Sequence, residues 1–233
     1  MCTVTFIARR NGYAIGMNRD ENLSRVQGLP PAQHQVNGRA AVFPSEPSGG
    51  TWIGVNDARV TFALINWYTV PTRVSDQPVS RGQVTLSVLG FDDPEAAEDE
   101  LLRYPLVQTN PFRLIGIFPE SHSVVEWRWD LRCLQRVAHD WQTNIWVSSG
   151  YDEPGADIAR RKTFQTAIRA GVAQDLRWLR QLHSSHDPAP NPYSICMHRA
   201  DARTVSYSEV SATDSAVEMT YSPSPLCRCH SKP

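Results

Sequence analysis

The sequence predicts an α+β protein in which two packed β-sheets are flanked by helices. Strand-like segments occur in pairs near both ends of the chain, helical segments lie between them, and 41% of the 233 residues are hydrophobic. No internal repeat or break in composition divides the chain. We therefore expect one domain over residues 1–222 and a loose C-terminal tail over residues 223–233.

The first third of the chain is predicted to contain two β-hairpins. Residues 3–9 are rich in β-branched and aromatic types, Asn11-Gly12 is a strong two-residue turn signal, and residues 13–17 resume the strand. Residues 18–50 carry four prolines and several glycines, so most of that stretch is expected to be loop around a short apolar segment. The second hairpin is predicted from residues 51–55 and 60–66.

Helices and further strands follow. Ser80 and Asp93 are predicted to begin two helices, and Pro94 suits a first helical turn. The remaining predicted elements are strands at 113–118, 122–129 and 144–148, helices at 156–170 and 172–184, and strands in YSICMHR (193–199), RTVSYSEV (203–210) and VEMTYS (217–222).

Charge and composition exclude several classes of function. A net charge of -1, from 23 basic and 24 acidic residues, argues against a nucleic-acid partner. No apolar run reaches the ~18 residues of a membrane span, and the start MCTVTFIARRNG carries no basic leader. The five scattered cysteines fit reduced thiols rather than a disulfide framework. These features predict a cytoplasmic protein without a membrane span.

The opening hairpin places a cation beside a thiol. If Asn11 and Gly12 form the turn, Cys2 faces Glu21. Arg19 is then the diagonal neighbour of Cys2 on the same face, roughly 7 to 8 Å away. Asp20 points to the opposite face.

This arrangement suits an N-terminal nucleophile. Removal of Met1 is expected because cysteine is small, and the α-amine of Cys2 then accepts the thiol proton, since the pKa of an α-amine is ordinarily about 7.7 to 8.0. Arg19 would favour the thiolate, Asp20 would hold the amine, and Asn66, at the end of a predicted strand, would bind the oxyanion. The alternative is an ordinary second residue beside a surface ion pair.

Five sequence blocks carry a family resemblance. In order they are MCTVTF, MNRDENL, GGTWIGV, LINWY and SRG, and together they resemble the NRDE family, also called the transport and Golgi organisation protein two family. Asn18-Arg19-Asp20-Glu21 matches the namesake tetrapeptide. The resemblance is strong over residues 1 to about 90 and thinner beyond.

The NRDE family is similar to the penicillin V acylase and choloylglycine hydrolase group. This similarity implies a four-layer αββα sandwich of the N-terminal nucleophile hydrolase type, with Cys2, Arg19 and Asp20 at catalytic positions. Ser149 and Pro192 stand near positions where that group has an Asn and an Arg, and Arg199 or Arg203 are the candidate replacements for the Arg.

Two functions follow from this resemblance. One is an amidohydrolase that acts on a C–N amide bond of a small acylated substrate. The other is a non-catalytic binding or trafficking protein for haem or acyl-CoA-like lipids, because members of the family are linked to both ligands. The fold is expected to transfer more securely than the activity.

Other chemistry-bearing residues form no recognisable site in the sequence. His183 and His186, with Cys227, Cys229 and His230, are of zinc-binding types, but their spacing matches no standard pattern. Cys196 and His198 share a face of a predicted strand, which indicates core packing. The sequence therefore predicts no metal and no cofactor, and it leaves the oligomeric state undetermined.

Overall fold

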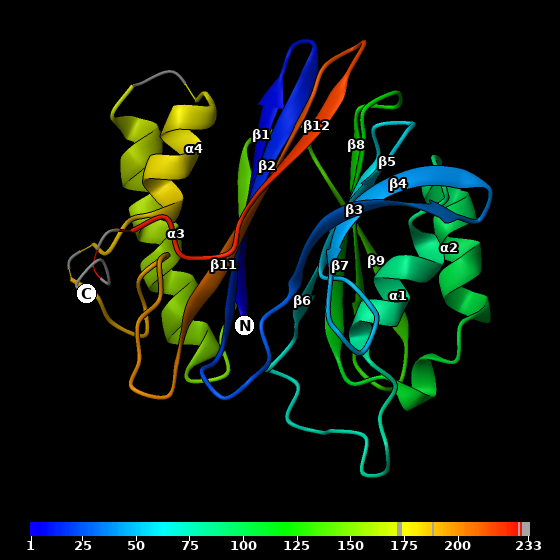
Figure 1. Ribbon diagram of the computed structural model, residues 1–233, viewed down its shortest axis with the longest axis horizontal. Coiled ribbons are helices and arrows are strands. Elements are labelled where there is room, and N and C mark those ends of the chain that lie inside the picture. The colour runs from blue at the N-terminus through cyan, green and yellow to red at the C-terminus, as the bar shows by residue number, and fades with distance from the viewer. Residues whose placement is uncertain (172–173, 188, 228, 230–233) are drawn as a thin grey trace.

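The chain folds into four layers, two helical and two β. A computed structural model describes residues 1–171, 174–187, 189–227 and 229. Two antiparallel sheets face each other, with helices on both outer sides (Figure 1). The helices are α1 (Arg81–Val88), α2 (Pro94–Arg103), α3 (Glu153–Arg169) and α4 (Leu176–His183). The αββα sandwich expected from the sequence is confirmed.

The five-stranded sheet holds both ends of the folded chain. Its strand order is β10-β1-β2-β11-β12, and its outer face is covered by α3 and α4. Because β1 is an inner strand, the start of the chain is hydrogen-bonded on both sides. The bounds are β1 Cys2–Arg9, β2 Gly12–Asn22, β10 Asn144–Ser148, β11 Ala202–Ala212 and β12 Val217–Ser222.

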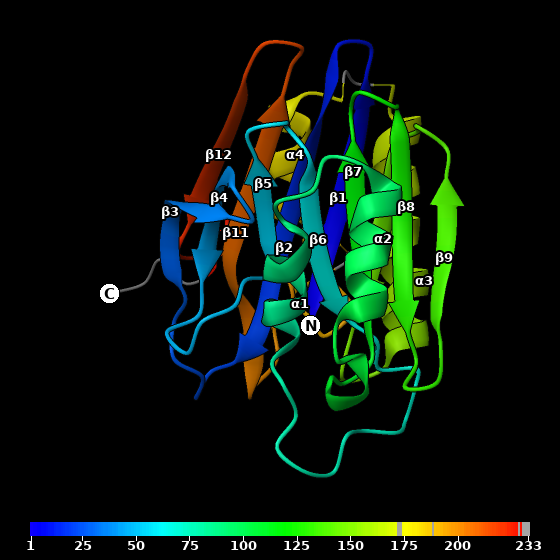
Figure 2. The same cartoon turned by 90° about the vertical axis from the view of Figure 1, so that its right-hand side faces the viewer.

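The seven-stranded sheet runs from β3 to β9 in sequence order. Figure 2 shows it behind α1 and α2, which cover its outer face. A short 3-10 helix, Leu106–Gln108, follows α2. The strand bounds are β3 Leu29–Val36, β4 Arg39–Ser45, β5 Ile53–Asn56, β6 Thr61–Asn66, β7 Phe112–Phe118, β8 Ser123–Trp129 and β9 Leu134–His139.

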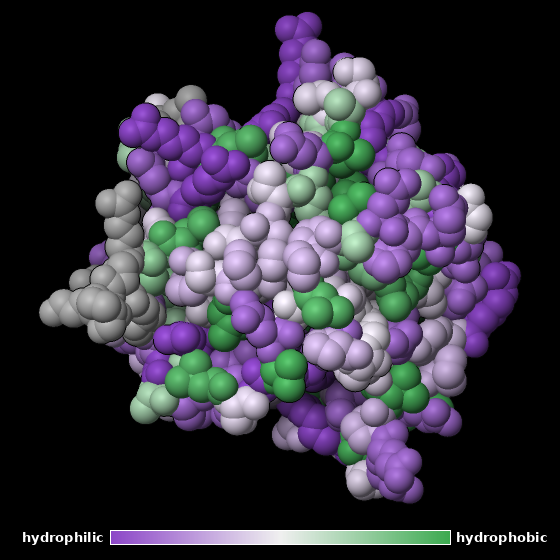
Figure 3. Space-filling view, in the orientation of Figure 1, coloured by the Kyte–Doolittle hydropathy of each residue, from purple (hydrophilic) through white to green (hydrophobic). Residues whose placement is uncertain are grey.

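Three apolar layers hold the sandwich together. The central layer lies between the sheets, where Phe6, Ile15, Ile115 and Trp146 are buried. Full burial of such a side chain stabilises a fold by about 1.5 to 3 kcal/mol. Two outer layers pack the helices on the sheets. On the outer surface in Figure 3, hydrophobic side chains form small groups separated by hydrophilic ones.

Each of the four α-helices begins directly after a residue whose side chain caps its first turn. The side chains of Ser80, Asp93, Asp152 and Asp175 each accept a hydrogen bond from a backbone N–H in the first turn of the helix that follows. The predicted starts at Ser80 and Asp93 are therefore confirmed. None of the helices in the described ranges is both long enough and apolar enough to cross a bilayer.

Residues 18–50 are mostly strand, so the loop predicted there was wrong. Strand β2 continues to Asn22, and β3 and β4 form a hairpin. Strand β3 is an exposed edge strand, which tolerates Pro30 and Pro31 and lacks an apolar face. Its sequence therefore carries no alternating hydrophobic pattern. The exposed edge strand β9 was missed for the same reason.

The segment 193–199 was predicted as a strand but is irregular. Only His198 forms a β-bridge, to Arg203. The rest is held by turns and side chains: Asn18 Nδ2 donates to the Ile195 carbonyl at 2.9 Å, and Ser194 Oγ donates to the Cys196 carbonyl at 2.7 Å. Side-chain contacts replace the ladder that a strand would require.

The turn of the opening hairpin lies one residue earlier than predicted. Its two turn residues are Arg10 and Asn11, and Gly12 begins β2 with a φ of 110°. A Cβ at Gly12 would lie 2.1 Å from the carbonyl oxygen of Ala212 on β11. The glycine is therefore required for the close approach of β2 to β11 rather than inside the turn.

This shift changes the partner of Cys2. Cys2 pairs directly with Arg19 rather than with Glu21. The partner thus moves by an even number of residues along β2, and side chains on one face of a strand recur at every second residue. Cys2 and Arg19 therefore remain on the same face of the sheet, as predicted.

Candidate active site

Cys2 lies between two polar residues on neighbouring strands. It is the first residue of β1 and pairs with Arg19 on β2 and with Ser148 on β10. Directly paired residues of antiparallel strands point to the same face, so the three side chains form one row. Cys2 is buried, with 7% of the residue exposed.

A pocket of about 280 Å³ opens above this row. Cys2 and Arg19 reach it from the five-stranded sheet, Asn66 from the other sheet, Trp52 from the residue before β5, and Arg81 from the start of α1. The pocket therefore lies where the two sheets meet, with the thiol on its wall.

Arg19 is held rigidly beside the thiol. Its guanidinium donates to Glu46 Oε1 at 2.9 Å and stacks over the Trp52 ring, with Cζ 4.5 Å from the ring centroid. Glu46 also accepts two hydrogen bonds from Arg25, at 2.8 and 2.7 Å. A paired and stacked guanidinium keeps one orientation.

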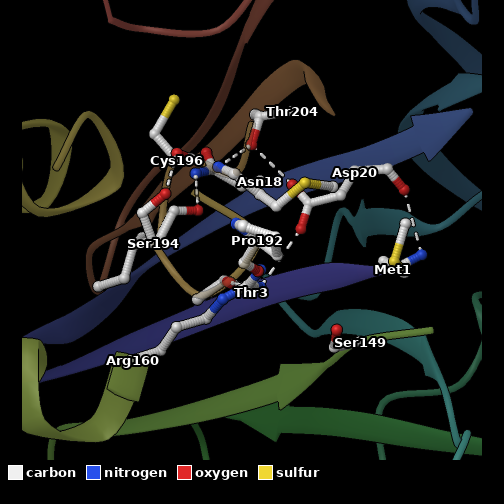
Figure 4. Close-up of polar contacts among 12 residues, drawn as sticks. Met1, Thr3, Asn18, Asp20, Ser149, Arg160, Pro192, Ser194, Cys196 and Thr204 are labelled. Atoms are coloured by element: carbon white, nitrogen blue, oxygen red, sulfur yellow. Dashed lines mark hydrogen bonds and ion pairs between the residues drawn. The ribbon is translucent and has the colours of Figure 1, made fainter. Parts of the chain in front are cut away.

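The Asp20 side chain points away from Cys2, as the strand alternation predicted. Its carboxylate accepts hydrogen bonds from Thr204 Oγ1 at 2.7 Å and from Arg160 Nη1 at 3.3 Å (Figure 4). Arg160 also donates to Thr3 Oγ1 at 2.7 Å and to the Pro192 carbonyl at 3.4 Å. Asp20 thus ties β2 to α3 and β11 behind the site.

The backbone of Asp20, rather than its carboxylate, holds the start of the chain. The Met1 amine donates to the Asp20 carbonyl at 3.1 Å, and the Asp20 N–H donates to the Met1 carbonyl at 2.8 Å. Met1 also lines the pocket. Removal of Met1 would therefore release one donor and one acceptor of Asp20 beside Cys2.

Charges around Met1 favour a protonated amine, and burial favours a neutral Cys2 thiol. Burial lowers the pKa of the Met1 amine, but Cys2, Tyr68, Glu21 and Asp20 outweigh it and raise that pKa to about 10. Burial raises the pKa of the Cys2 thiol, and Asp20 and Glu21 add to this, against the Met1 amine and Arg19. With Met1 in place, the thiol is therefore not activated.

Asn66 reaches the same pocket from the end of β6. Its Nδ2 donates one hydrogen bond to the Tyr68 hydroxyl at 2.8 Å. An amide NH₂ carries two hydrogens, and no second acceptor for them lies within the described ranges. The role of Asn66 as an oxyanion donor stays a prediction.

The residues near the expected Asn and Arg positions offer no equivalent groups. The Ser149 hydroxyl accepts a hydrogen bond from the Tyr151 N–H at 3.3 Å, and Pro192 contributes only its carbonyl to Arg160. Of the two candidate replacements, Arg199 lies at Met1, with Nη1 3.9 Å from Sδ. Arg203 lines a neighbouring pocket together with Arg19.

Sequence reasoning missed three residues that shape the site. Ser148 pairs with Cys2 from a strand far along the chain, and Glu46 comes from a segment predicted as loop. Arg81, the third, carried a usable signal, because it belongs to SRG, one of the five family blocks. Arg81 Nη1 donates to the Pro111 carbonyl at 3.2 Å.

The fold is of the N-terminal nucleophile hydrolase type, and it resembles two solved structures at low identity. Penicillin V acylase from Agrobacterium tumefaciens matches with a TM-score of 0.52 and 11% identity, over 95% of this chain and 85% of that one. A variant of conjugated bile acid hydrolase from Clostridium perfringens matches with a TM-score of 0.51 and 10% identity, over 96% and 92%.

The chain belongs to the Transport and Golgi organisation 2 family, whose model matches residues 1–154. The matched region contains Cys2, Arg19, Asp20 and Asn66. No curated protein matches the chain. The resemblance drawn from the NRDE tetrapeptide and its companion blocks is thereby confirmed.

Proposed function

We propose that this chain is an N-terminal-cysteine amidohydrolase that cleaves a C–N amide bond in a small acylated molecule. The observation that carries the proposal is the position of Cys2. It follows Met1 directly, lines a pocket between the sheets, and lies in one row with Arg19 and Ser148. Removal of one residue would give this thiol its own α-amine as a base.

The reaction proceeds in two halves. The α-amine of Cys2 takes the thiol proton, and the sulfur attacks the carbonyl carbon of the amide. The C–N bond then breaks, the leaving nitrogen takes the proton from the α-amine, and an acyl thioester remains on Cys2. Water, deprotonated by the same amine, attacks the thioester, which releases the carboxylic acid and returns the proton to the thiol.

Three groups support this chemistry. Arg19 stabilises the thiolate, because its charge opposes the effect of burial on the pKa of Cys2. The second hydrogen of Asn66 Nδ2 and the Asp20 N–H, released with Met1, supply donors for the oxyanion. The carbonyl of Asp20, which accepts from the Met1 amine, would orient the new amine of Cys2.

The pocket favours a substrate with an anionic or strongly polar group. Arg19 and Arg25 already form ion pairs with Glu46 and Glu21. Arg81 lines the same pocket and forms no ion pair with any residue in the described ranges. A carboxylate on the substrate would form an ion pair with Arg81.

A second candidate is a binding or trafficking protein for haem or acyl-CoA-like lipids that uses the same pocket without turnover. Ser149 and Pro192 favour it, because neither presents a side-chain N–H donor near Cys2. Under this alternative, Cys2 contributes only to the pocket wall.

The Cys2→Ala variant separates the two candidates. Under the enzyme proposal, incubation of the processed chain with a panel of N-acyl amino acids gives hydrolysis and, in quenched samples, an acyl adduct on Cys2 by mass spectrometry. Cys2→Ala loses both, whereas Cys133→Ser, which alters an exposed thiol, keeps both. Unchanged binding of haem or acyl-CoA by Cys2→Ala, with no turnover by either protein, would support the carrier.

A further inference from the structure

A cluster of two thiols and two imidazoles lies outside the candidate active site. His186 follows α4, Cys196 and His198 precede β11, and Cys227 follows β12. One potential ligand atom from each lies within 4.8 Å of those of the other three. In the described ranges, no other group of three or more such side chains meets this description.

Three distances within the cluster lie within about 0.5 Å of the edges of a zinc tetrahedron. Zinc bonds of about 2.05 Å to nitrogen and 2.3 Å to sulfur give edges of about 3.3 Å for N–N and 3.6 Å for N–S. The His186 and His198 Nε2 atoms are 2.9 Å apart. The His198 Nε2 atom lies 3.5 Å from Cys227 Sγ and 3.8 Å from Cys196 Sγ.

Hydrogen bonding does not account for this convergence. The Nε2 atom of His198 has three ligand-type atoms around it, two of them sulfur. An imidazole nitrogen either donates one hydrogen or accepts with one lone pair, and thiols are weak partners in both roles. A cation at the centre could be coordinated by both imidazoles and both thiolates at once.

We propose that His186, Cys196, His198 and Cys227 bind one structural zinc ion. Two thiolates and two imidazoles in a tetrahedral arrangement are a typical zinc donor set. Cys229 adds an outer contact, since its Sγ lies nearer His186 Nδ1, at 3.4 Å, than Nε2, at 3.9 Å. A group on the second nitrogen of a ligating histidine fixes the orientation of its ring.

The zinc ion would join the turn after α4 and the segment before β11 to the tail, whose ligand Cys227 lies 29 residues beyond His198. The described tail is also held by Gln27, whose Nε2 donates to the Pro223 carbonyl at 2.8 Å, and by the contact of Cys229 with His186. Cys196 is itself anchored to the turn after α4, because its N–H donates to the Ser185 carbonyl at 3.0 Å. The ion would therefore crosslink the tail to the turn after α4.

The proposed site is also connected to Asp20 through hydrogen bonds of Met197 and Thr204. The Met197 N–H donates to Thr204 Oγ1 at 2.9 Å, and that hydroxyl donates to Asp20 at 2.7 Å. Figure 4 shows Cys196 on the far side of Asn18 and Thr204 from Met1. The zinc site thus adjoins the active-site scaffold without lining its pocket.

The sequence predicted no metal because the spacing of its histidines and cysteines matches no standard zinc pattern. His183 lies in the core, where its Nε2 contacts Thr5 Oγ1 at 3.0 Å, and His230 lies outside the described residues. Cys196 and His198 were expected to serve only in core packing. Only the turn after α4 and the course of the tail bring the four ligands together.

The test is metal binding by the full chain, purified under reducing conditions and stripped with a chelator. We expect one equivalent of zinc per chain by native mass spectrometry. Cobalt in its place should give the strong visible bands of a tetrahedral site and a thiolate charge-transfer band. Zinc should also raise the Tm, and a chelator should reverse the increase.

Variants identify the ligands without disturbing the core. Cys227→Ser, in the tail, and His198→Gln should lose the stoichiometric zinc, whereas the matched Cys133→Ser keeps it. Cys229→Ser should weaken zinc binding by about 10-fold to 100-fold, as expected for a group outside the ligand set. Absence of zinc and cobalt binding in the wild type would overturn the proposal, as would unchanged binding in Cys227→Ser and His198→Gln. A disulfide between Cys196 and Cys227 in freshly isolated protein would do the same.

Discussion

Cys2 and Arg19 are direct partners across the β1–β2 hairpin, and Arg19 is fixed by Glu46 at 2.9 Å and by the ring of Trp52. The thiol therefore has beside it a guanidinium that is held in one orientation. The same hairpin leaves Asp20 on the opposite face, where it joins β2 to the rest of the domain.

Retention of Met1 is expected to suppress the reactivity of Cys2. With Met1 present, burial raises the pKa of the thiol, and the charged amine belongs to another residue. Processing gives Cys2 its own amine as a base. We expect a limiting alkylating probe to label Cys2 at least about 10-fold faster in the processed chain, a factor equal to one pKa unit.

The two forms can be prepared with and without an inhibitor of methionine aminopeptidase and distinguished by intact mass. The exposed Cys133 serves as the internal control, because its labelling should not depend on Met1. Equal labelling rates of Cys2 in both forms would contradict an activated nucleophile.

Arg19→Leu should shift the pH profile of Cys2 labelling in the processed chain to higher pH. Arg19 lowers the pKa of the thiol, so its loss raises that pKa, by about 1 unit for a neighbouring opposite charge. Arg25→Leu is the matched control, since Arg25 shares the Glu46 carboxylate but does not pair with Cys2. If the pH profiles of wild type and Arg19→Leu coincide, Arg19 does not lower the pKa of the Cys2 thiol.

Arg160→Ala should destabilise the fold by about 3 to 5 kcal/mol, because it leaves a buried carboxylate without its cation. Arg160 and Asp20 are 1% and 0% exposed. Arg161→Ala, its neighbour on α3, removes a partly exposed ion pair with Asp157 and should cost less than about 0.5 kcal/mol. Urea unfolding measures both, and similar losses for the two variants would contradict a structural role for Asp20.

His183 should make the fold sensitive to acid. Burial, followed by the charge of Arg160, lowers its pKa to about 3 from the ordinary 6.5. The folded chain then binds fewer protons than the unfolded chain between these values. The contribution of neutral His183 to stability is complete above pH 6.5 and is lost as the pH falls toward 3, with a slope of about 1.4 kcal/mol per pH unit.

His183→Gln should reduce the pH dependence of the free energy of unfolding by that slope over the same window. The exposed His34 on β3 provides the control, and His34→Gln should keep the wild-type dependence. The measurement is urea unfolding at a series of pH values. An unchanged slope in His183→Gln would show that this histidine is not held neutral.

The sequence by itself determined the strands and helices of two packed sheets flanked by helices, the opening hairpin and the shared face of Cys2 and Arg19, whereas the four-layer αββα type followed from the family resemblance. The first three of these features depend on short-range rules: turn chemistry, helix caps and the alternation of side chains along a strand. Alternation survives an error of one residue in the position of the turn, which is why the face was right although the direct partner was wrong.

Only the tertiary structure decided which distant groups surround these residues. Arg160 and Thr204 lie 140 and 184 positions from Asp20, and Ser148 reaches Cys2 from another strand. The cluster of His186, Cys196, His198 and Cys227 depends on the turn after α4 and on the path of the tail. Such contacts depend on how sheets and helices pack, which many weak apolar contacts determine together and which no local pattern encodes.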